Sequence, residues 1–187
     1  MNTRRSISMF VVMAMVATGF GCGLVTVAPQ TAQAGGAYMF KGAGQNGAGG
    51  VTAGSRRVIR GENGNFHKNS KSVRTDGSGN VKSKRVKAFE APNGSSGSVA
   101  SGTTRTADGS LQHQSNAEYN GQNVTASSSG NITKSADGQV TATKQSSATT
   151  ASGAGYTGST SYDPATGLSK SRVCTNQYGE TVPCPKQ

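Results

Sequence analysis

The sequence predicts an all-β, low-complexity protein made of repeated short strands and hairpins, either β-solenoid-like or stacked, with a partly disordered N-terminal part. Large apolar residues are scarce, turn signals recur about every 30 residues, and the segments between turns are short and rich in Thr, Ser and Val. Beyond an N-terminal apolar stretch, no window has the three-and-four apolar spacing of an amphipathic helix.

Residues 1–34 are predicted to be a signal peptide. Arg4 and Arg5 precede a long apolar run from Ile7 to Ala28, and Ala32 and Ala34 supply the small residues of a signal-peptidase site. We therefore expect the mature chain to be secreted, to the extracellular space or the cell surface of a bacterium.

Two other interpretations of this segment stay open. It is nearly long enough to be retained as a membrane anchor. It could also be the leader of a lipoprotein acylated at Cys22, although "GFGC" lacks the branched aliphatic residue usual before a lipidated cysteine.

Composition argues against a large core. Leu, Ile, Val and Phe total 17 of the 153 residues from Gly35 onward, about 11%, which is below the roughly 20% under which disorder becomes a serious prior. The net charge of this part is +9, from 17 Lys and Arg against 8 Asp and Glu. Residues 35–54 are rich in glycine, and we expect a flexible linker there.

Turn signals recur at regular intervals along the chain. Asp-Gly and Asn-Gly tolerate the positive φ values that tight hairpin turns require. The strong signals are Asp76-Gly77, Asp108-Gly109, Asp137-Gly138 and the "DPATG" motif that ends at Gly167, and their glycines are nearly evenly spaced along the chain. Weaker signals lie at Asn93-Gly94, Asn120-Gly121, Gly130-Asn131 and Tyr178-Gly179.

A two-residue turn at Asp137-Gly138 would fix the register of the hairpin around it. Ser135 would then lie opposite Val140, and Lys134 opposite Thr141. One face of such a hairpin is small and weakly apolar, whereas the other carries the basic residue.

A lone hairpin of this kind is marginal in water. Stacked units, within one chain or between chains, would stabilise each other, with ladders of Ser, Thr, Asn and Gln replacing part of the apolar burial. If the repeat unit marked by the strong turns is real, Arg105 and Lys134 are equivalent and project on the same side of the sheet.

Two cysteines remain once the signal peptide is removed. Cys174 and Cys184 flank nine residues with Tyr178-Gly179 as a central turn, and in an oxidising compartment this predicts a disulfide. Such a small ring stabilises by roughly 2 to 3 kcal/mol. Zinc is the alternative, but it needs about four ligands and no histidine lies nearby.

Basic residues concentrate between Ser55 and Lys87, where ten Lys or Arg stand against Glu62 and Asp76, a local net charge of +8. This density predicts binding to a polyanion such as acidic polysaccharide, extracellular DNA or lipopolysaccharide. The alternative is that edge lysines only keep a β-rich chain soluble. The candidate residues are Arg56, Arg57, Arg60, Lys68, Lys71, Arg74, Lys82, Lys84, Arg85 and Lys87.

The chain therefore divides into five predicted parts. A signal peptide (1–34) and a linker (35–54) precede a basic β-repeat section (55–91). Ser/Thr/Gly-rich hairpin repeats (92–163) and a disulfide-closed C-terminal hairpin (164–187) follow.

Residue sets for catalysis are not found in the sequence. His67 and His113 have no patterned Cys, Asp or Glu partners, and "DGSGNV" (Asp76 to Val81) departs from a calcium loop at the positions that need Gly and Glu. The glycine-rich stretch from Gly42 to Gly50 lacks the Lys of a phosphate-binding loop. We predict no enzyme activity, catalytic residue, metal, cofactor or small-molecule substrate.

The region from Val51 to Tyr178, rich in Gly, Ser, Asn, Gln and Thr behind a signal peptide, resembles the curlin type of bacterial fibre subunit. The resemblance is one of composition and turn rhythm, with fragments such as "GQNVTA" (Gly121 to Ala126) close to the curlin repeat. It implies self-assembly into an extracellular fibre or matrix, without turnover of a substrate.

The sequence thus predicts a secreted structural protein that assembles with copies of itself into an extracellular fibre, pilus-like filament or biofilm matrix, and adheres through a basic surface. The alternative is a monomeric cell-surface module that binds a polyanion or carbohydrate. An ice- or carbohydrate-binding solenoid would need Thr at one constant period, which "TAT" and "TTRT" do not give.

Overall fold

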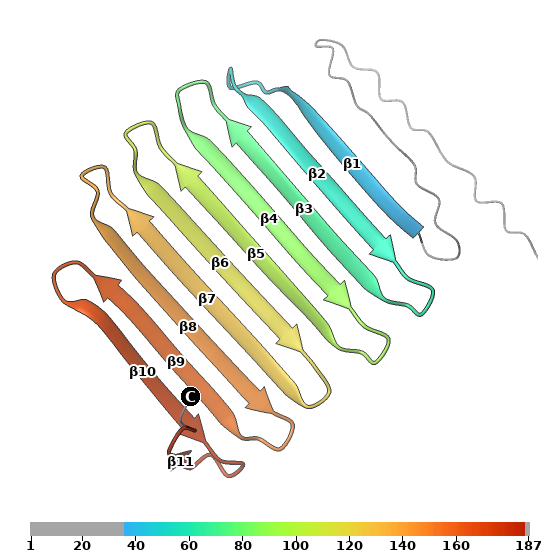
Figure 1. Ribbon diagram of the computed structural model, residues 1–187, viewed down its shortest axis with the longest axis vertical. Coiled ribbons are helices and arrows are strands. Elements are labelled where there is room, and N and C mark those ends of the chain that lie inside the picture. The colour runs from blue at the N-terminus through green and yellow to red at the C-terminus, as the bar shows by residue number, and fades with distance from the viewer. Residues whose placement is uncertain (1–35, 186–187) are drawn as a thin grey trace, which may run out of the picture.

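The computed structural model describes residues 36–185 and contains one open, fully antiparallel sheet of eleven strands in chain order (Figure 1). The predicted all-β class with repeated hairpins is confirmed, and the hairpins lie side by side in a single sheet. The predicted signal peptide, with Ala32, Ala34 and Cys22, lies outside the described residues. Among the described residues, no helix has the length and apolarity needed to cross a membrane.

The strands β1 to β10 are of similar length, and β11 is short. Their bounds are β1 Gly36–Gln45, β2 Val51–Arg60, β3 Phe66–Thr75, β4 Val81–Glu90, β5 Ser96–Arg105, β6 Leu111–Asn120, β7 Val124–Lys134, β8 Val140–Thr150, β9 Gly155–Asp163, β10 Gly167–Thr175 and β11 Thr181–Val182.

The first six strands begin at positions 36, 51, 66, 81, 96 and 111, so one strand and one turn always take the same length of chain. The regular spacing of the strong turn signals therefore corresponds to one hairpin unit of two strands and two turns. Because neighbouring strands are antiparallel, the turns with Asp76, Asp108 and Asp137 lie along one end of the sheet. The turns with Asn93 and Tyr178 lie along the other.

The Asp137 turn is one residue longer than the two-residue turn predicted. Ser135 N donates to Gln139 O at 2.9 Å, Gly138 N donates to Ser135 O at 3.0 Å, and Gly138 has a φ of 92°. This is a three-residue loop whose glycine occupies the left-handed region. Asp137 alone therefore does not decide the loop length.

The longer loop shifts the strand register by one residue. Lys134 pairs with Val140, and Thr133 pairs with Thr141. The predicted pairing of Ser135 with Val140 and of Lys134 with Thr141 is wrong for this reason. A shift of one residue matters because side chains alternate between the two faces of a sheet.

The register defines two faces. Directly paired residues share a face, and successive residues along a strand alternate between faces. We call face A the face that carries Arg105, Leu111 and Lys134, which pair in one row, and face B the opposite face, which carries Thr104 and Thr133. The prediction that Arg105 and Lys134 lie on the same side is confirmed.

Two local predictions fail. The range 35–54, expected to be a flexible linker, contains β1 and the start of β2. Its Gly and Ala give no strand pattern, but β1 pairs with β2 along its whole length, from Gly36 opposite Arg60 to Gln45 opposite Val51. Gly130 and Asn131, predicted as a weak turn, lie inside β7. The turns at 46–50, 61–65 and 151–154 were not predicted.

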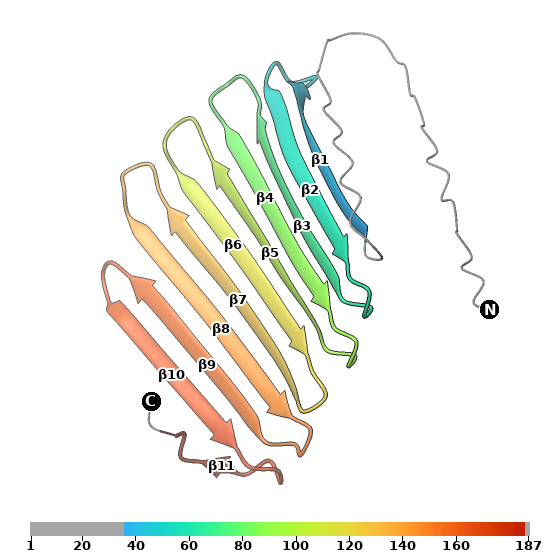
Figure 2. The ribbon, with the colours of Figure 1, turned by 45° about the vertical axis from the view of Figure 1, so that its right-hand side comes forward.

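No second layer covers either face of the sheet within the described residues (Figure 2). The most buried side chains, Cys174 and Ser95, each keep 8% of their surface exposed, while Leu168 is 60% exposed. Domains are usually built from two or three packed layers around a core. This sheet depends instead on its hydrogen-bond ladders and on side-chain pairs across neighbouring strands.

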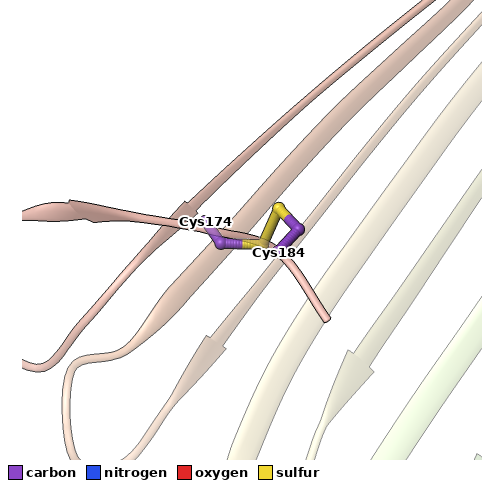
Figure 3. Close-up of a disulfide and its surroundings, with 2 residues drawn as sticks. All are labelled: Cys174 and Cys184. Carbon is purple, nitrogen blue, oxygen red and sulfur yellow. A yellow bond between two sulfur atoms is a disulfide. The ribbon is translucent and has the colours of Figure 1, made fainter. Parts of the chain in front are cut away.

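The predicted disulfide joins Cys174 to Cys184 with a Cα–Cα distance of 5.3 Å (Figure 3). It ties the short β11 to the end of β10, where Cys174 pairs with Val182 and Thr175 with Thr181. The turn between these strands contains Gly179, at a φ of 81°. The C-terminal hairpin is therefore closed as predicted, but it covers only the last residues of β10.

Candidate binding surfaces

The sheet divides the ten predicted cationic residues between its two faces. The register places Arg57, Lys71, Arg85 and Lys87 on face A. It places Arg56, Arg60, Lys68, Arg74, Lys82 and Lys84 on face B. The basic run of the sequence is therefore not one surface, because side chains alternate along each strand.

Face A gains further cations from strands outside that run. They are Lys41, Arg105, Lys134, Lys144, Lys170 and Arg172. With the four residues above, ten cationic side chains lie on the strands of face A, and no Asp or Glu does. Sequence reasoning missed these six because they are scattered over β1, β5, β7, β8 and β10. Only a correct register assigns them to one face.

Face B changes character along the sheet. Its six cations lie on β2 to β4, and its acids are Glu90, Glu118 and Asp163. Over β6 to β10 it presents mainly Ser, Thr, Asn and Gln. Hydroxyls pair across strands on this face, with oxygen–oxygen distances of 2.7 Å for Ser127 and Ser147 and 2.9 Å for Ser159 and Ser171.

Like charges face each other twice in the basic region. Lys71 lies directly opposite Arg85 on face A, and Arg74 directly opposite Lys82 on face B. Like charges at such positions destabilise a sheet. A bound anion between the two side chains would remove the repulsion, so each pair is a candidate anion contact.

Aromatic side chains form a row across face A. His67, Phe89 and Tyr119 lie on β3, β4 and β6, with ring centroids 6.4 Å apart for each neighbouring pair and interplanar angles of 28° and 32°. Tyr156 on β9 lies in the same row of the register. These residues were not predicted as a site, because they are far apart in the sequence and no shared motif surrounds them.

Ring atoms of two of these residues lie directly over glycines, Phe89 over Gly97 of the neighbouring β5 and Tyr156 over Gly158 of its own strand. A Cβ atom added at Gly97 would lie 2.5 Å from Cε1 of Phe89, and one at Gly158 would collide with the Tyr156 hydroxyl. A ring in this position shields the bare backbone beneath it. The aromatic row thus lies close to the backbone and lines a shallow depression of the sheet.

The two histidines have different surroundings on face A. His67 belongs to the aromatic row, whereas Nδ1 of His113 hydrogen-bonds with Oγ1 of Thr103 at 2.8 Å. Within residues 36–185, no group of three or more His, Cys, Asp or Glu side chains is placed to hold a metal ion.

Three predicted turn carboxylates act within their own turns. The hydroxyls of Ser110 and Thr106 donate to Asp108, both at 2.5 Å, and lower its pKa to about 2. The Asn80 amide likewise lowers the pKa of Asp76, and the Ser135 hydroxyl that of Asp137. These acids close turns at one end of the sheet, where they lie off both faces.

The described chain is thus a two-faced sheet. Face A carries ten cations and the aromatic row without an Asp or Glu, whereas face B is basic over β2 to β4 and mainly neutral and polar over β6 to β10. No family model, no curated protein and no solved structure matches it.

Proposed function

We propose that the protein is a secreted structural protein of a bacterial surface, which assembles with copies of itself into an extracellular fibre or matrix and adheres through its basic surface. One observation carries the proposal: a single-layer sheet that ends in two long strand edges. Unpaired strand edges are templates for pairing with another chain.

Both edges offer unpaired backbone groups. The N–H and C=O groups of successive residues point to alternate sides of a strand. Thr150 N donates to Ala154 O, which fixes the alternation along β9 and β10, so the N–H and C=O groups of Leu168, Lys170 and Arg172 face outward from β10. On β1, the bond from Asn46 N to Gly50 O sets the alternation, and Met39, Lys41 and Ala43 face outward. Neither set has a strand partner among the described residues.

The two edges are complementary in direction. The long strands β1 to β10 are even in number, so β1 of a second copy in the same orientation would be antiparallel to β10. The outward residues then meet row by row: Leu168 opposite Ala43, Lys170 opposite Lys41, and Arg172 opposite Met39. Such a head-to-tail contact uses two different surfaces and does not close on itself, so it propagates into a fibre.

The β11 strand limits this contact without abolishing it. It pairs only with Cys174 and Thr175, leaving residues 167–173 of β10 open. A stretch of that length exceeds the usual strand of about 5–6 residues. The repulsion between Lys170 and Lys41 at the centre of the contact makes assembly dependent on salt or on a bridging anion.

A matched pair of substitutions tests the proposal. Lys170→Gln removes the charge and keeps the outward N–H, so fibres should form faster at low salt than with the unmodified chain. Lys170→Pro removes the same charge and the N–H, while the β9 ladder stays intact, so it should remain monomeric. Negative-stain microscopy and sedimentation read the outcome. Equal assembly of the two variants, or monomers under all conditions, would exclude edge pairing.

A monomeric polyanion-binding adhesion module is the second candidate, supported by the absence of acidic residues from the strands of face A. It predicts that purified mature protein binds an anionic polymer while sedimenting as a monomer. Sedimentation with and without the polymer separates this function from fibre formation.

A further inference from the structure

We propose that face A binds an acidic polysaccharide, laid across the strands along the aromatic row with its carboxylates on the flanking cations. This rests on the adhesive part of the proposed function, and not on self-assembly. The sequence pointed to a polyanion contact at residues 56–87; the structure assigns the contact to one face, and most of that face lies outside this range.

Charge selects face A. Its ten cations span β1 to β10 without an acid on the same face of these strands, whereas the cations of face B stop at β4 and are followed by Glu118 and Asp163. An extended anionic chain crossing all strands would meet opposite charge throughout on face A. On face B it would meet a neutral and partly acidic half.

Position links the cations to the aromatic row. Face A is hollowed over β3 to β9 by a shallow depression of about 770 Å³, lined by Phe89, Tyr119 and Tyr156 together with Lys87 and Lys144. A polymer lying in this depression contacts the π faces and the ammonium groups at once. The repulsive pair of Lys71 and Arg85 lies on face A four residues along β3 and β4 from His67 and Phe89, and a carboxylate bound between the two side chains would relieve the repulsion.

The position of the rings on the sheet favours a polysaccharide over single-stranded nucleic acid. Ring atoms of Phe89 and Tyr156 lie directly over Gly97 and Gly158, so the backbone closes the rings to a ligand from the side of the sheet. A ribbon of sugar rings can lie on such a platform with its apolar C–H faces down. Bases usually stack on aromatic side chains within a groove that follows the phosphate backbone, and this shallow, open row has no such walls.

The test uses the mature chain with Lys170→Pro in every arm, so that binding is measured on monomers. The face A variant carries Arg85→Gln, Lys87→Gln and Lys144→Gln. The matched face B variant carries Arg56→Gln, Lys68→Gln and Lys84→Gln, with the same loss of charge. A third variant, Phe89→Ser with Tyr119→Ser, removes two rings and no charge, and circular dichroism checks that each variant stays folded.

Titration with polygalacturonate, with neutral dextran and oligo-dT as comparison polymers, gives the readout. We expect the face A variant to bind polygalacturonate at least about tenfold more weakly and the face B variant less than about threefold. The ring variant should also lose affinity, and dextran should not bind. Equal losses for the two charge variants, or no loss without the rings, would overturn the proposal.

Tighter ring-dependent binding of oligo-dT would assign the face to nucleic acid and likewise overturn the proposal. Fibre formation is scored separately by sedimentation of the unmodified chain. Loss of binding with normal fibres, or the reverse, shows which of the two proposals has failed.

Discussion

The two faces of this sheet are built from the same strands, yet they differ in charge and chemistry. On β8, face A carries Val140, Ala142 and Lys144, while face B carries Thr141 and Thr143. Only alternate residues of each strand share a face. The difference teaches that the chemistry of each face depends on whether a residue stands at an odd or an even position of its strand. A run of basic residues along the chain therefore describes neither face.

The largest effect should come from glycines of β5 on opposite faces. Gly97→Val on face A places a Cβ 2.5 Å from Cε1 of Phe89 and 3.2 Å from the Glu118 carbonyl, so the ring must leave its platform and unfolding free energy should fall by about 1–3 kcal/mol. At Gly102 on face B the nearest atom is the Ser83 carbonyl at 3.7 Å, and Gly102→Val should be neutral or stabilise by up to ~1 kcal/mol.

Urea denaturation followed by circular dichroism measures both variants. Opposite signs would confirm that the Phe89 ring covers the β5 backbone at Gly97 and that no ring covers it at Gly102. Equal destabilisation would show that the Phe89 ring does not lie over Gly97.

Introducing one acidic residue on face A should stabilise the sheet and weaken its binding of polygalacturonate. Ser101 lies directly opposite Arg85, so Ser101→Glu relieves the repulsion with Lys71 and should stabilise by ~0.2–1 kcal/mol. The same change should weaken polygalacturonate binding by roughly threefold, since one attracting charge is neutralised. Ala100→Glu, the neighbouring position on face B, is the control, and a similar loss of affinity there would contradict the assignment.

Loss of a hydroxyl pair on face B should have a smaller effect on the free energy of unfolding. Oγ1 of Thr133 and Oγ1 of Thr141 are 2.5 Å apart, and a double-mutant cycle to Ala should give a coupling of about 0.2–1 kcal/mol. Binding of polygalacturonate should not change, because these residues are absent from face A. A change in binding without a change in stability would move the polysaccharide to face B.

The carboxylates of the turns should affect the stability of only the turns that hold them. Because the folded pKa of Asp108 is lowered to about 2 from 3.8, its contribution is present above pH 3.8 and is lost as the pH falls toward 2. Protection of the backbone amides of residues 106–110, measured against the intrinsic exchange rate at each pH, should therefore fall in that window by more than in residues 91–95, where neutral Asn93 accepts from Ser95 N. The difference should vanish in Asp108→Asn.

Local chemistry made part of this fold predictable. The motif shared by "RTADGS" and "KSADGQ" placed equivalent turns one hairpin unit apart, and it correctly put Arg105 and Lys134 on one side. The disulfide followed from cysteine spacing. The loop length around Asp137 did not, because Gly138 can serve a two-residue or a three-residue turn, and one residue decides which side chains share a face.

The single layer and the binding face could not be predicted for a different reason. Low apolar content excludes a large core, but it is equally compatible with stacked hairpins and with hairpins side by side. The cations of face A become one surface only through pairing of successive strands from Lys41 to Arg172. The glycine-rich β1 gives no pattern of its own, since its structure depends on pairing with β2.

The constant spacing of β1 to β6 makes this part of the chain a molecular ruler. Deletion of residues 66–95 would remove β3 and β4 and join the turn at 61–65 to β5, with every remaining residue in its original row. Each strand adds about 4.8 Å to the sheet, so the loss of one unit shortens it by about 10 Å. Both outer strands are unchanged, so deletion or duplication of one hairpin unit would change the width of the sheet in fixed steps while both edges stay the same.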